Sequence, residues 1–202
     1  MSEHYFSKTP QSNRSPETWQ YHLRHNTYQF TSDAGVFSKH SIDFGTALLI
    51  ESFTRPDVPG DLLDVGCGYG PIGISLAALF EDHNVVMIDV NERAISLAKH
   101  NAEQNNIHHI TVKQSDGLTE VMGEQFSAVV TNPPIRAGKD VIYQMFTDAK
   151  EVLQVGGTLW IVIQKKQGAP SAKKKLQELF GHVEEVARKK GYFIFKATKF
   201  DS

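Results

Sequence analysis

The stretch that decides the fold is LLDVGCGYGPIG, at residues 62–73. Its first four residues are typical of a short buried strand, and Gly66, Gly68 and Gly70 allow the chain to turn sharply. Pro71 suits the first turn of a helix, where its missing N–H leaves no hydrogen bond unmade. The stretch therefore predicts a strand, a tight glycine loop and a helix, and such a loop can lie directly against a ligand.

Strands and helices keep alternating after this unit. Each expected strand is a short apolar run, and each expected helix has apolar residues at helical spacing. The expected strands are 62–65, 85–89, 110–113, 126–131 and 159–164, and the expected helices are 71–80, 92–105, 141–153 and 171–180. Repeated units of this kind imply an α/β fold, with a mostly parallel sheet that carries helices on both faces.

The end of the chain reads as a pair of strands. Residues 183–187 and 192–197 alternate in a strand pattern and are joined by Lys-Lys-Gly, so they predict a hairpin that adds one antiparallel strand to the sheet. Gly156 and Gly157 read as the stop signal of the preceding helix.

The N-terminal residues have a different pattern. Residues 1–16 are polar and predict a flexible tail, and alternating aromatic residues over 19–30 predict a β-hairpin with one apolar face. A helix is expected over 41–53. We therefore expect a tail and hairpin extension over 1–40 and the α/β domain over 41–202.

Composition narrows the class of protein. The chain has 202 residues, of which 40% are hydrophobic and 22% charged, as in an average globular domain. No apolar run approaches the roughly 18 residues of a membrane span, and the N-terminus lacks a signal-peptide core. A single cysteine, Cys67, excludes an internal disulfide, and the nine histidines show no metal-ligand spacing. These features predict a cytoplasmic protein without a metal site.

Three aspartates follow successive strands. Asp64 precedes the first glycine of the loop, where its carboxylate can accept a hydrogen bond from a ligand ammonium group. Asp89 ends the next strand, where an acid usually binds ribose hydroxyls, and Asp116 follows the third strand. Because ligands of open α/β sheets bind at the carboxyl ends of the strands, the three should converge. The alternative reading makes them helix caps beside an ordinary turn.

A second motif, VVTNPPI at residues 129–135, follows the fourth strand. Pro133 and Pro134 fix two φ angles and hold Asn132 extended. The Asn132 side-chain oxygen and the Pro133 carbonyl can then accept both hydrogens of an exocyclic amino group, which favours a nucleophilic nitrogen without a strong base. The alternative is a simple loop turn.

Together these motifs resemble the class I S-adenosylmethionine-dependent methyltransferases, and most closely the ribosomal RNA small-subunit guanine-N2 methyltransferases and their single-domain relatives. Residues 33–38 (DAGVFS) and 43–45 (DFG) are similar to the segment that precedes the catalytic domain in that subgroup. The resemblance implies a Rossmann-like seven-stranded sheet with one antiparallel strand, and S-adenosylmethionine as cofactor.

The resemblance also implies residue roles. The expected cofactor-binding residues are those of the glycine loop, of the two following strand ends and of the second motif, namely Asp64, Gly66, Cys67, Gly68, Gly70, Asp89, Val90, Asp116, Gly117 and Asn132. Asp89 would bind the ribose and Asp116 the adenine amino group. Asn132, Pro133 and Pro134 would form the catalytic turn, and Phe37 would cover the active site.

The methyl acceptor is inferred from the charge distribution and from one residue, Ile135, that differs from the usual pattern of related methyltransferases. Residues 1–135 hold 8 Lys or Arg against 16 Asp or Glu, whereas residues 136–202 hold 13 against 7. The basic half suits RNA, although ordinary solvated helix faces would give the same count. Ile135 stands where adenine and glutamine methyltransferases usually carry an aromatic residue, which favours guanine.

RNA, in particular ribosomal RNA or the small subunit, is therefore the expected partner. The expected substrate contacts are the residues beside the second motif and after the fifth strand, namely Phe37, Ile135, Arg136, Lys139, Lys165 and Lys166. Two alternatives stay open. One is a protein glutamine N5-methyltransferase, and the other is a catalytically silent RNA-binding module.

Overall fold

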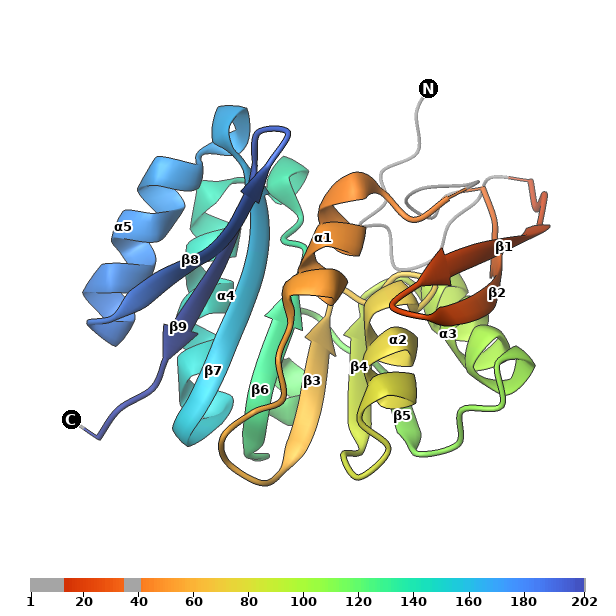
Figure 1. Ribbon diagram of the computed structural model, residues 1–202, viewed down its shortest axis with the longest axis horizontal. Coiled ribbons are helices and arrows are strands. Elements are labelled where there is room, and N and C mark those ends of the chain that lie inside the picture. The colour runs from red at the N-terminus through yellow and green to blue at the C-terminus, as the bar shows by residue number, and fades with distance from the viewer. Residues whose placement is uncertain (1–12, 35–40, 202) are drawn as a thin grey trace.

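The computed structural model describes residues 13–34 and 41–201. An antiparallel hairpin opens the described chain, with strands β1 (Glu17–Leu23) and β2 (Asn26–Ser32). Arg24 and His25 form its tight turn, both with positive φ. The hairpin is a separate two-stranded sheet that lies outside the main sheet, beside α3 (Figure 1).

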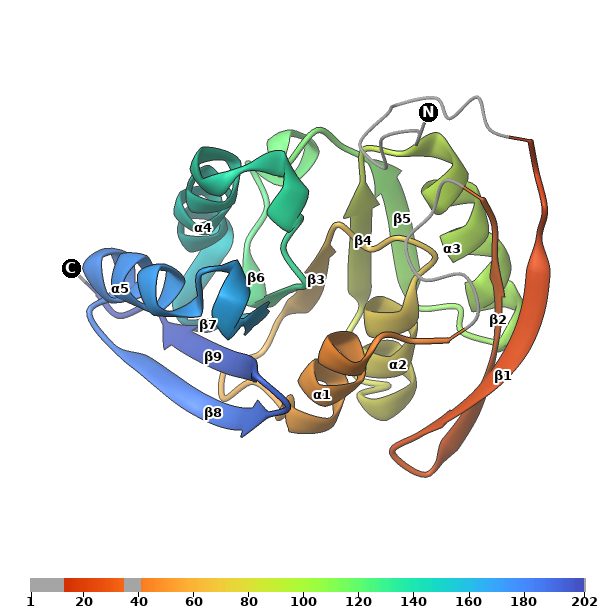
Figure 2. The same cartoon turned by 90° about the horizontal axis from the view of Figure 1, so that it is seen from above.

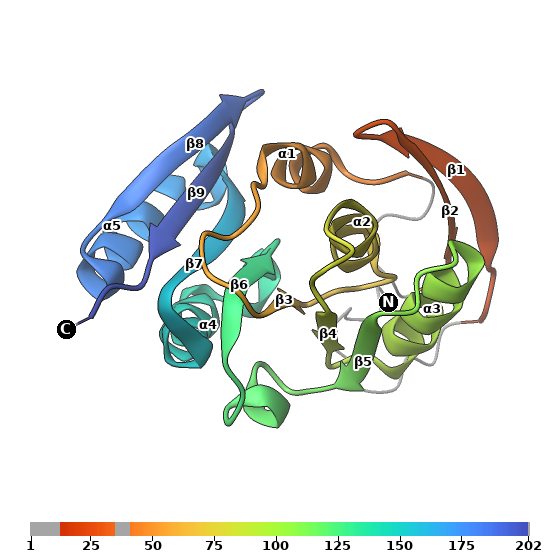
Figure 3. The same cartoon turned by 60° about the horizontal axis from the view of Figure 1, so that its bottom comes forward.

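The main sheet has seven strands, and its order confirms the predicted Rossmann-like fold. The strands are β3 (Asp61–Val65), β4 (Val85–Asp89), β5 (Ile110–Gln114), β6 (Phe126–Thr131), β7 (Leu153–Gln164), β8 (Val183–Lys189) and β9 (Tyr192–Thr198). They lie in the order β5-β4-β3-β6-β7-β9-β8. β9 is antiparallel to both of its neighbours, whereas the other pairs are parallel, so the sheet contains the one antiparallel strand expected from the sequence (Figure 3).

Helices cover both faces of this sheet. They are α1 (Phe44–Ser52), α2 (Pro71–Leu79), α3 (Glu92–Gln104), α4 (Lys139–Val152) and α5 (Ala169–Phe180). The apolar side chains of α1, α2 and α3 form one buried cluster with one face of the sheet and with the hairpin. Those of α4 and α5 form a second cluster on the opposite face (Figure 2). Three layers therefore leave the carboxyl ends of the parallel strands at one edge.

One interpretation of a glycine pair is wrong. The helix expected over 141–153 does end at Val152, but Gly156 and Gly157, interpreted as its stop signal, belong to β7. Between Phe126 and Ala128 the register of β6 against β7 shifts, and Gly156 has a φ of 81° there. The glycines therefore allow an irregularity in the pairing of β6 and β7. A glycine pair can mark such a strand irregularity as well as the end of a helix.

The first helix also begins later than expected, at Phe44. Asp43 is its N-cap, because the Asp43 carboxylate accepts a hydrogen bond from the Thr46 N–H at 3.1 Å. The cap fixes where α1 starts, above the end of β6 and β7, and this placement matters for the site described below.

Candidate active site

The glycine loop connects β3 to α2 at the carboxyl edge of the sheet. Gly66, Gly68 and Gly70 all have positive φ, and the N–H groups of Gly66 and Cys67 both donate to the Ile88 carbonyl of β4. A Cβ placed on Gly66 would meet no atom within 4 Å, so the loop faces open space there. The backbone is therefore exposed to a ligand at this point.

Asp64 lies beneath this loop and is only 1% exposed. Its Oδ2 accepts a hydrogen bond from the Gly73 N–H at 2.9 Å, whereas its buried Oδ1 accepts none within residues 13–34 and 41–201. Burial raises the pKa of Asp64 to about 7 against the Gly73 hydrogen bond, and the neighbouring Asp89 charge raises it further. An ammonium group would satisfy the free oxygen and favour the carboxylate, so the site fits the amino-acid end of S-adenosylmethionine.

Asp89 ends β4 and is 3% exposed. Its two oxygens accept hydrogen bonds from the N–H groups of Gly68 and Asn91, both at 2.9 Å. These bonds hold the Asp89 carboxylate against the glycine loop at the carboxyl end of β4. Val90, the next residue, is half-buried, and its carbonyl accepts from the Gln114 side chain.

Three other predicted cofactor residues differ in their exposure. Asp116 and Gly117 are exposed after β5, and Gly117 has a φ of 59° with no atom within 4 Å of an added Cβ. Cys67 is instead buried, and burial raises the pKa of its thiol well above the usual value. Its backbone N–H supports the loop, so the thiol itself is not a nucleophile here.

Asn132 follows β6 at the same edge. The Thr131 hydroxyl donates to the Val65 carbonyl at 2.8 Å, which ties the end of β6 to the strand that carries the glycine loop. The Asn132 Nδ2 donates to the Thr46 hydroxyl of α1 at 3.0 Å. This bond uses one of the two Nδ2 hydrogens and fixes which way the amide faces, and Oδ1 is the atom that can accept a hydrogen bond from another molecule. Pro133 is buried and Pro134 half-buried, so the turn is held firmly.

Thr46 is therefore a site residue that the sequence reasoning missed. Its position depends on the Asp43 cap and on the docking of α1, and neither is visible from the spacing of the two motifs. In the sequence, the available signal was Asp43 three residues before Thr46, a spacing that suits a helix N-cap.

The predicted RNA contacts lie on neighbouring loops. Ile135, half-buried, and Arg136, exposed, belong to a short 3₁₀ helix, Ile135–Ala137, and exposed Lys139 begins α4. Exposed Lys165 and Lys166 follow β7 in a second 3₁₀ helix. Since β6 and β7 are adjacent, these cations share one edge of the sheet.

The structure adds the turn between β8 and β9 to them. The Lys165 N–H donates to the Gly191 carbonyl at 2.9 Å, and the Lys190 Nζ lies 4.7 Å from the centroid of the Phe44 ring. We call Arg136, Lys139, Lys165, Lys166 and Lys190 the basic rim. By contrast, Lys173 pairs with Glu185 on the outer surface.

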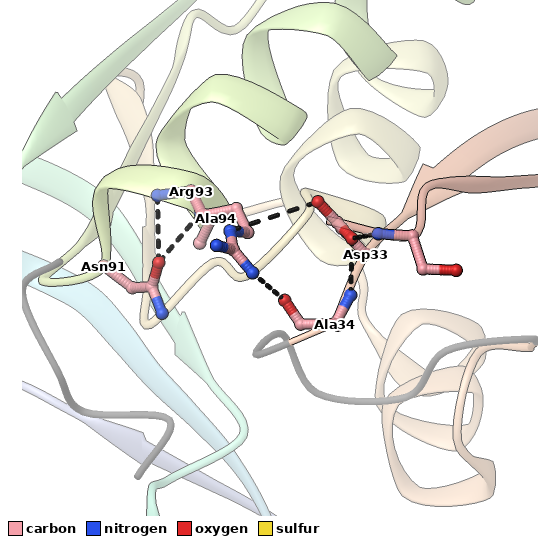
Figure 4. Close-up of polar contacts among 6 residues, drawn as sticks. Asp33, Ala34, Asn91, Arg93 and Ala94 are labelled. Carbon is pink, nitrogen blue, oxygen red and sulfur yellow. Dashed lines mark hydrogen bonds and ion pairs between the residues drawn. The ribbon is translucent and has the colours of Figure 1, made fainter. Parts of the chain in front are cut away.

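Phe37, expected to cover the active site, lies outside the described residues. The residues just before that gap are anchored beside the cofactor edge. The Arg93 guanidinium of α3 lies 4.0 Å from the Asp33 carboxylate and donates to the Ala34 carbonyl, and Asn91 caps the same helix (Figure 4). Arg93 and Asp33 are both buried, so this anchor fixes the end of the hairpin next to Asp89.

Neither a membrane-spanning helix nor a cluster of metal ligands is found among the described residues. No helix in the described ranges is long and apolar enough to cross a bilayer. No group of three potential metal ligands occurs in the same part of the chain.

Comparison with known proteins gives the site a context. The family model described as "Methyltransferase small domain" matches residues 27–196. The chain is 56% identical over 200 residues to the uncharacterized protein YbxB of Bacillus subtilis (strain 168), a match that covers 98% of this chain and all of that protein.

Ribosomal RNA methyltransferases are also similar. Ribosomal RNA small subunit methyltransferase C of Actinobacillus pleuropneumoniae serotype 3 (strain JL03) is 34% identical over 80% of this chain, and large subunit methyltransferase G of Cronobacter sakazakii (strain ATCC BAA-894) is 30% identical over 92%. The match covers 49% and 50% of those proteins, so the chain spans about half of their length.

The fold has a solved counterpart. The Thermus thermophilus 16S rRNA N2 G1207 methyltransferase, solved with AdoMet and guanosine, superposes with a TM-score of 0.80 at 22% identity. The superposition covers 94% of this chain and 52% of that one, and it establishes the shared architecture.

Proposed function

Because this chain belongs to the methyltransferase small domain family, we propose that it methylates the exocyclic N2 amino group of a guanine in small-subunit (16S) ribosomal RNA. The chain is a methyltransferase with S-adenosylmethionine as its cofactor, which supplies an electrophilic methyl group when bound. The proposal concerns the residues that hold it and the acceptor.

Cofactor binding is assigned to the edge formed by β3, β4 and β5. The free Asp64 Oδ1 would accept from the ammonium group, and Asp89 would accept from the ribose hydroxyls. Asp116 and Gly117 would flank the adenine, because they follow β5 beside open space. Gly66 and Gly68 let the backbone approach the ligand without an intervening side chain.

The observation that carries the proposal is the orientation of Asn132. Its Nδ2 donates to the Thr46 hydroxyl, and an amide held in this orientation would present Oδ1 to the methyl acceptor as a hydrogen-bond acceptor. An amino group that donates to Asn132 Oδ1 and to the Pro133 carbonyl would direct its lone pair away from both. Positioning and removal of water can then provide much of the rate without a strong base.

Guanine in rRNA is favoured over the other acceptors by two observations. Ile135 gives apolar contact without an aromatic surface, and the basic rim lies at the same edge as Asn132. The similar small subunit methyltransferase C supports the small subunit, whereas the similar large subunit methyltransferase G makes the large subunit the second candidate. The intact acidic residues and Asn132 disfavour a silent RNA-binding module, and the basic rim disfavours a protein glutamine acceptor.

The test is transfer of labelled methyl groups to separated small and large ribosomal subunits, free RNA and bulk protein, followed by nucleoside analysis. N2-methylguanosine in small-subunit RNA is the expected product. Asn132→Ala should reduce transfer by at least about 100-fold, as the loss of a transition-state donor or acceptor typically does, while the cofactor Kd changes less than about twofold. Asp89→Ala should instead weaken cofactor binding.

Each other outcome has a definite meaning. Label in the large subunit alone would replace the small-subunit target, and label in protein alone would replace RNA by the glutamine acceptor. Cofactor affinity that falls in parallel with transfer in Asn132→Ala would contradict the acceptor role of that residue.

A further inference from the structure

A buried acceptor without a partner lies on the last residue of β7, the strand that neighbours β6. The Gln164 Oε1 is fully buried and accepts no hydrogen bond in the described ranges 13–34 and 41–201. Leaving such an oxygen unpaired is unfavourable, and in native proteins it calls for an explanation. The position of Gln164 indicates a ligand.

Strand register places Gln164 at the acceptor side of the active site. Thr131 pairs with Ile161, so Asn132 and Gln164 continue two adjacent parallel strands past their last shared pair. Trp160 and Val162 of β7 point to the face covered by α1, and because side chains alternate along a strand, Gln164 points there too. Asn132 reaches the same face, because it bonds to Thr46 of α1.

Two aromatic rings lie on the side of Gln164 toward β9 and α1. Tyr192 of β9 is the register partner of Gln164, and its ring packs on Gly45 so closely that a Cβ there would lie 2.6 Å from Cε1. Phe44 lies against Tyr192 with ring centroids 5.5 Å apart, and Lys190 of the basic rim lies over Phe44. A flat base near Asn132 would therefore have apolar ring surface and a cation for its phosphate within the same group of residues.

Guanine has the edge that matches these acceptors. Its N2 amino group and its N1–H are adjacent donors, whereas adenine has an unprotonated ring nitrogen beside its amino group. Asn132 Oδ1 and the Pro133 carbonyl would take the two amino hydrogens, so an adjacent acceptor is needed for N1–H. The lone pair of the adenine ring nitrogen, placed opposite Gln164 Oε1, would be repelled by it.

On this basis we propose that Gln164 determines the choice of base by accepting the N1–H of guanine, with the Phe44–Tyr192 pair beside it as the ring surface. The inference rests on the proposed guanine-N2 activity and adds its specificity-determining residue. Gln164 acts on recognition, because it contacts the base and not the transferred group.

The test compares two nucleosides that share the N2 amino group. The full-length protein, saturated with S-adenosylhomocysteine, is titrated with guanosine and with 2-aminopurine riboside, which has no N1–H, and binding is followed by NMR. Wild type should bind guanosine at least about tenfold more tightly. Gln164→Leu should reduce this preference to within about twofold, and Gln164→Glu, which keeps an acceptor, should retain it.

Gln167→Leu is the matched control, since Gln167 is exposed and only three residues away. It should behave as wild type in both titrations, and the Kd for S-adenosylhomocysteine should be unchanged in all variants. A guanosine preference that survives in Gln164→Leu, or that is lost in Gln164→Glu, would overturn the assignment of Gln164.

Failure of the proposed function has a different signature. If wild type forms N2-methylguanosine in RNA but Gln164→Leu keeps the preference, only the role of Gln164 is wrong. If wild type forms no N2-methylguanosine and binds the two nucleosides equally, the guanine acceptor itself is wrong.

Discussion

Asp64 shows how a single buried residue prepares the site for a cation. Its carboxyl group has lost nearly all contact with water, has one backbone hydrogen bond and lies near the second acid, Asp89. These surroundings disfavour the charged form until a positive group arrives. The residue therefore weakens the unliganded fold as the pH rises from about 4 to about 7, and a bound ammonium group would favour its charged form.

The pH dependence of stability should show this effect. The pKa of Asp64 is raised from 3.8 to about 7 in the folded chain, so between these values the folded protein holds a proton that the unfolded chain has released. The stabilising contribution is complete below about pH 4 and is lost as the pH rises through about 7. The total is about 4 kcal/mol, at about 1.4 kcal/mol per pKa unit.

Chemical denaturation of wild type and Asp64→Asn between pH 5 and pH 8 measures this contribution of Asp64 to the free energy of unfolding. The difference in the free energy of unfolding should fall by about 1.4 kcal/mol per pH unit up to about pH 7 and then level off, because the amide does not titrate. A constant difference over this range would show that Asp64 is already ionised in the unliganded protein.

Thr46 acts on the acceptor side through one hydrogen bond. Thr46→Val keeps the side-chain shape and removes the oxygen that orients Asn132. We expect turnover to fall about tenfold, corresponding to about 1.4 kcal/mol, while the cofactor Kd stays within about twofold. Thr46→Ser restores the hydroxyl and should recover most of the rate. Equal turnover in Thr46→Val and wild type would mean that Asn132 is oriented by the turn alone.

At the scale of elements, Asn101 of α3 and Asn105, the C-cap of that helix, bond to β2 as a neighbouring strand would. The Asn101 amide bonds with both the N–H and the carbonyl of Thr31, and the Asn105 amide does the same with Gln29. Four residues of helix advance about 6 Å and two residues of a strand about 6.7 Å, so the two spacings nearly match. Asn101 also donates to the Tyr69 carbonyl, which joins the hairpin to the glycine loop.

This arrangement predicts unequal effects of two similar substitutions. Asn101→Ala removes the partners of the buried Thr31 N–H and carbonyl and one bond to the Tyr69 carbonyl, so the free energy of unfolding should fall by about 2–4 kcal/mol. Asn105→Ala removes the equivalent pair of bonds at an exposed position and should lower it by less than about 1 kcal/mol. Denaturant titration of both variants measures the difference, and equal losses would argue against burial as the cause.

Sequence patterns predicted where the helices and strands lie better than which of them contact one another. The strand 85–89 and the strand 126–131 have the expected limits, because uninterrupted apolar runs end at polar turn residues. The strand β7 was expected to be shorter, since a glycine pair does not distinguish a bulge from a helix end. Thr46 and Gln164 were missed because their roles depend on which strands become neighbours.

At the scale of the whole molecule, basic residues are concentrated in the second half of the sequence, and several of them lie together at one edge of the folded protein. The net charge is −2, yet the basic rim collects cations from the loops after β6, β7 and β8 at one edge. Such a patch can attract a polyanion even though the protein as a whole is slightly acidic.

Salt dependence should report how many of these cations contact phosphate. Lys165→Gln and Lys166→Gln should each weaken binding of ribosomal RNA and reduce the slope of log K against log salt by about 0.7–1. Lys99→Gln on α3, also exposed, is the control and should leave the slope unchanged. The slopes come from binding isotherms at several salt concentrations, and equal slopes in all three variants would remove the two lysines from the RNA interface.

The position of β9 between β7 and β8 has a consequence for synthesis. β8 is made before β9, yet its register partners in the sheet are all residues of β9. β8 can therefore join the sheet only through β9, and β9 must first pair with β7. The half of the sheet that carries Gln164 and Lys190 should then be the last to form on a newly made chain.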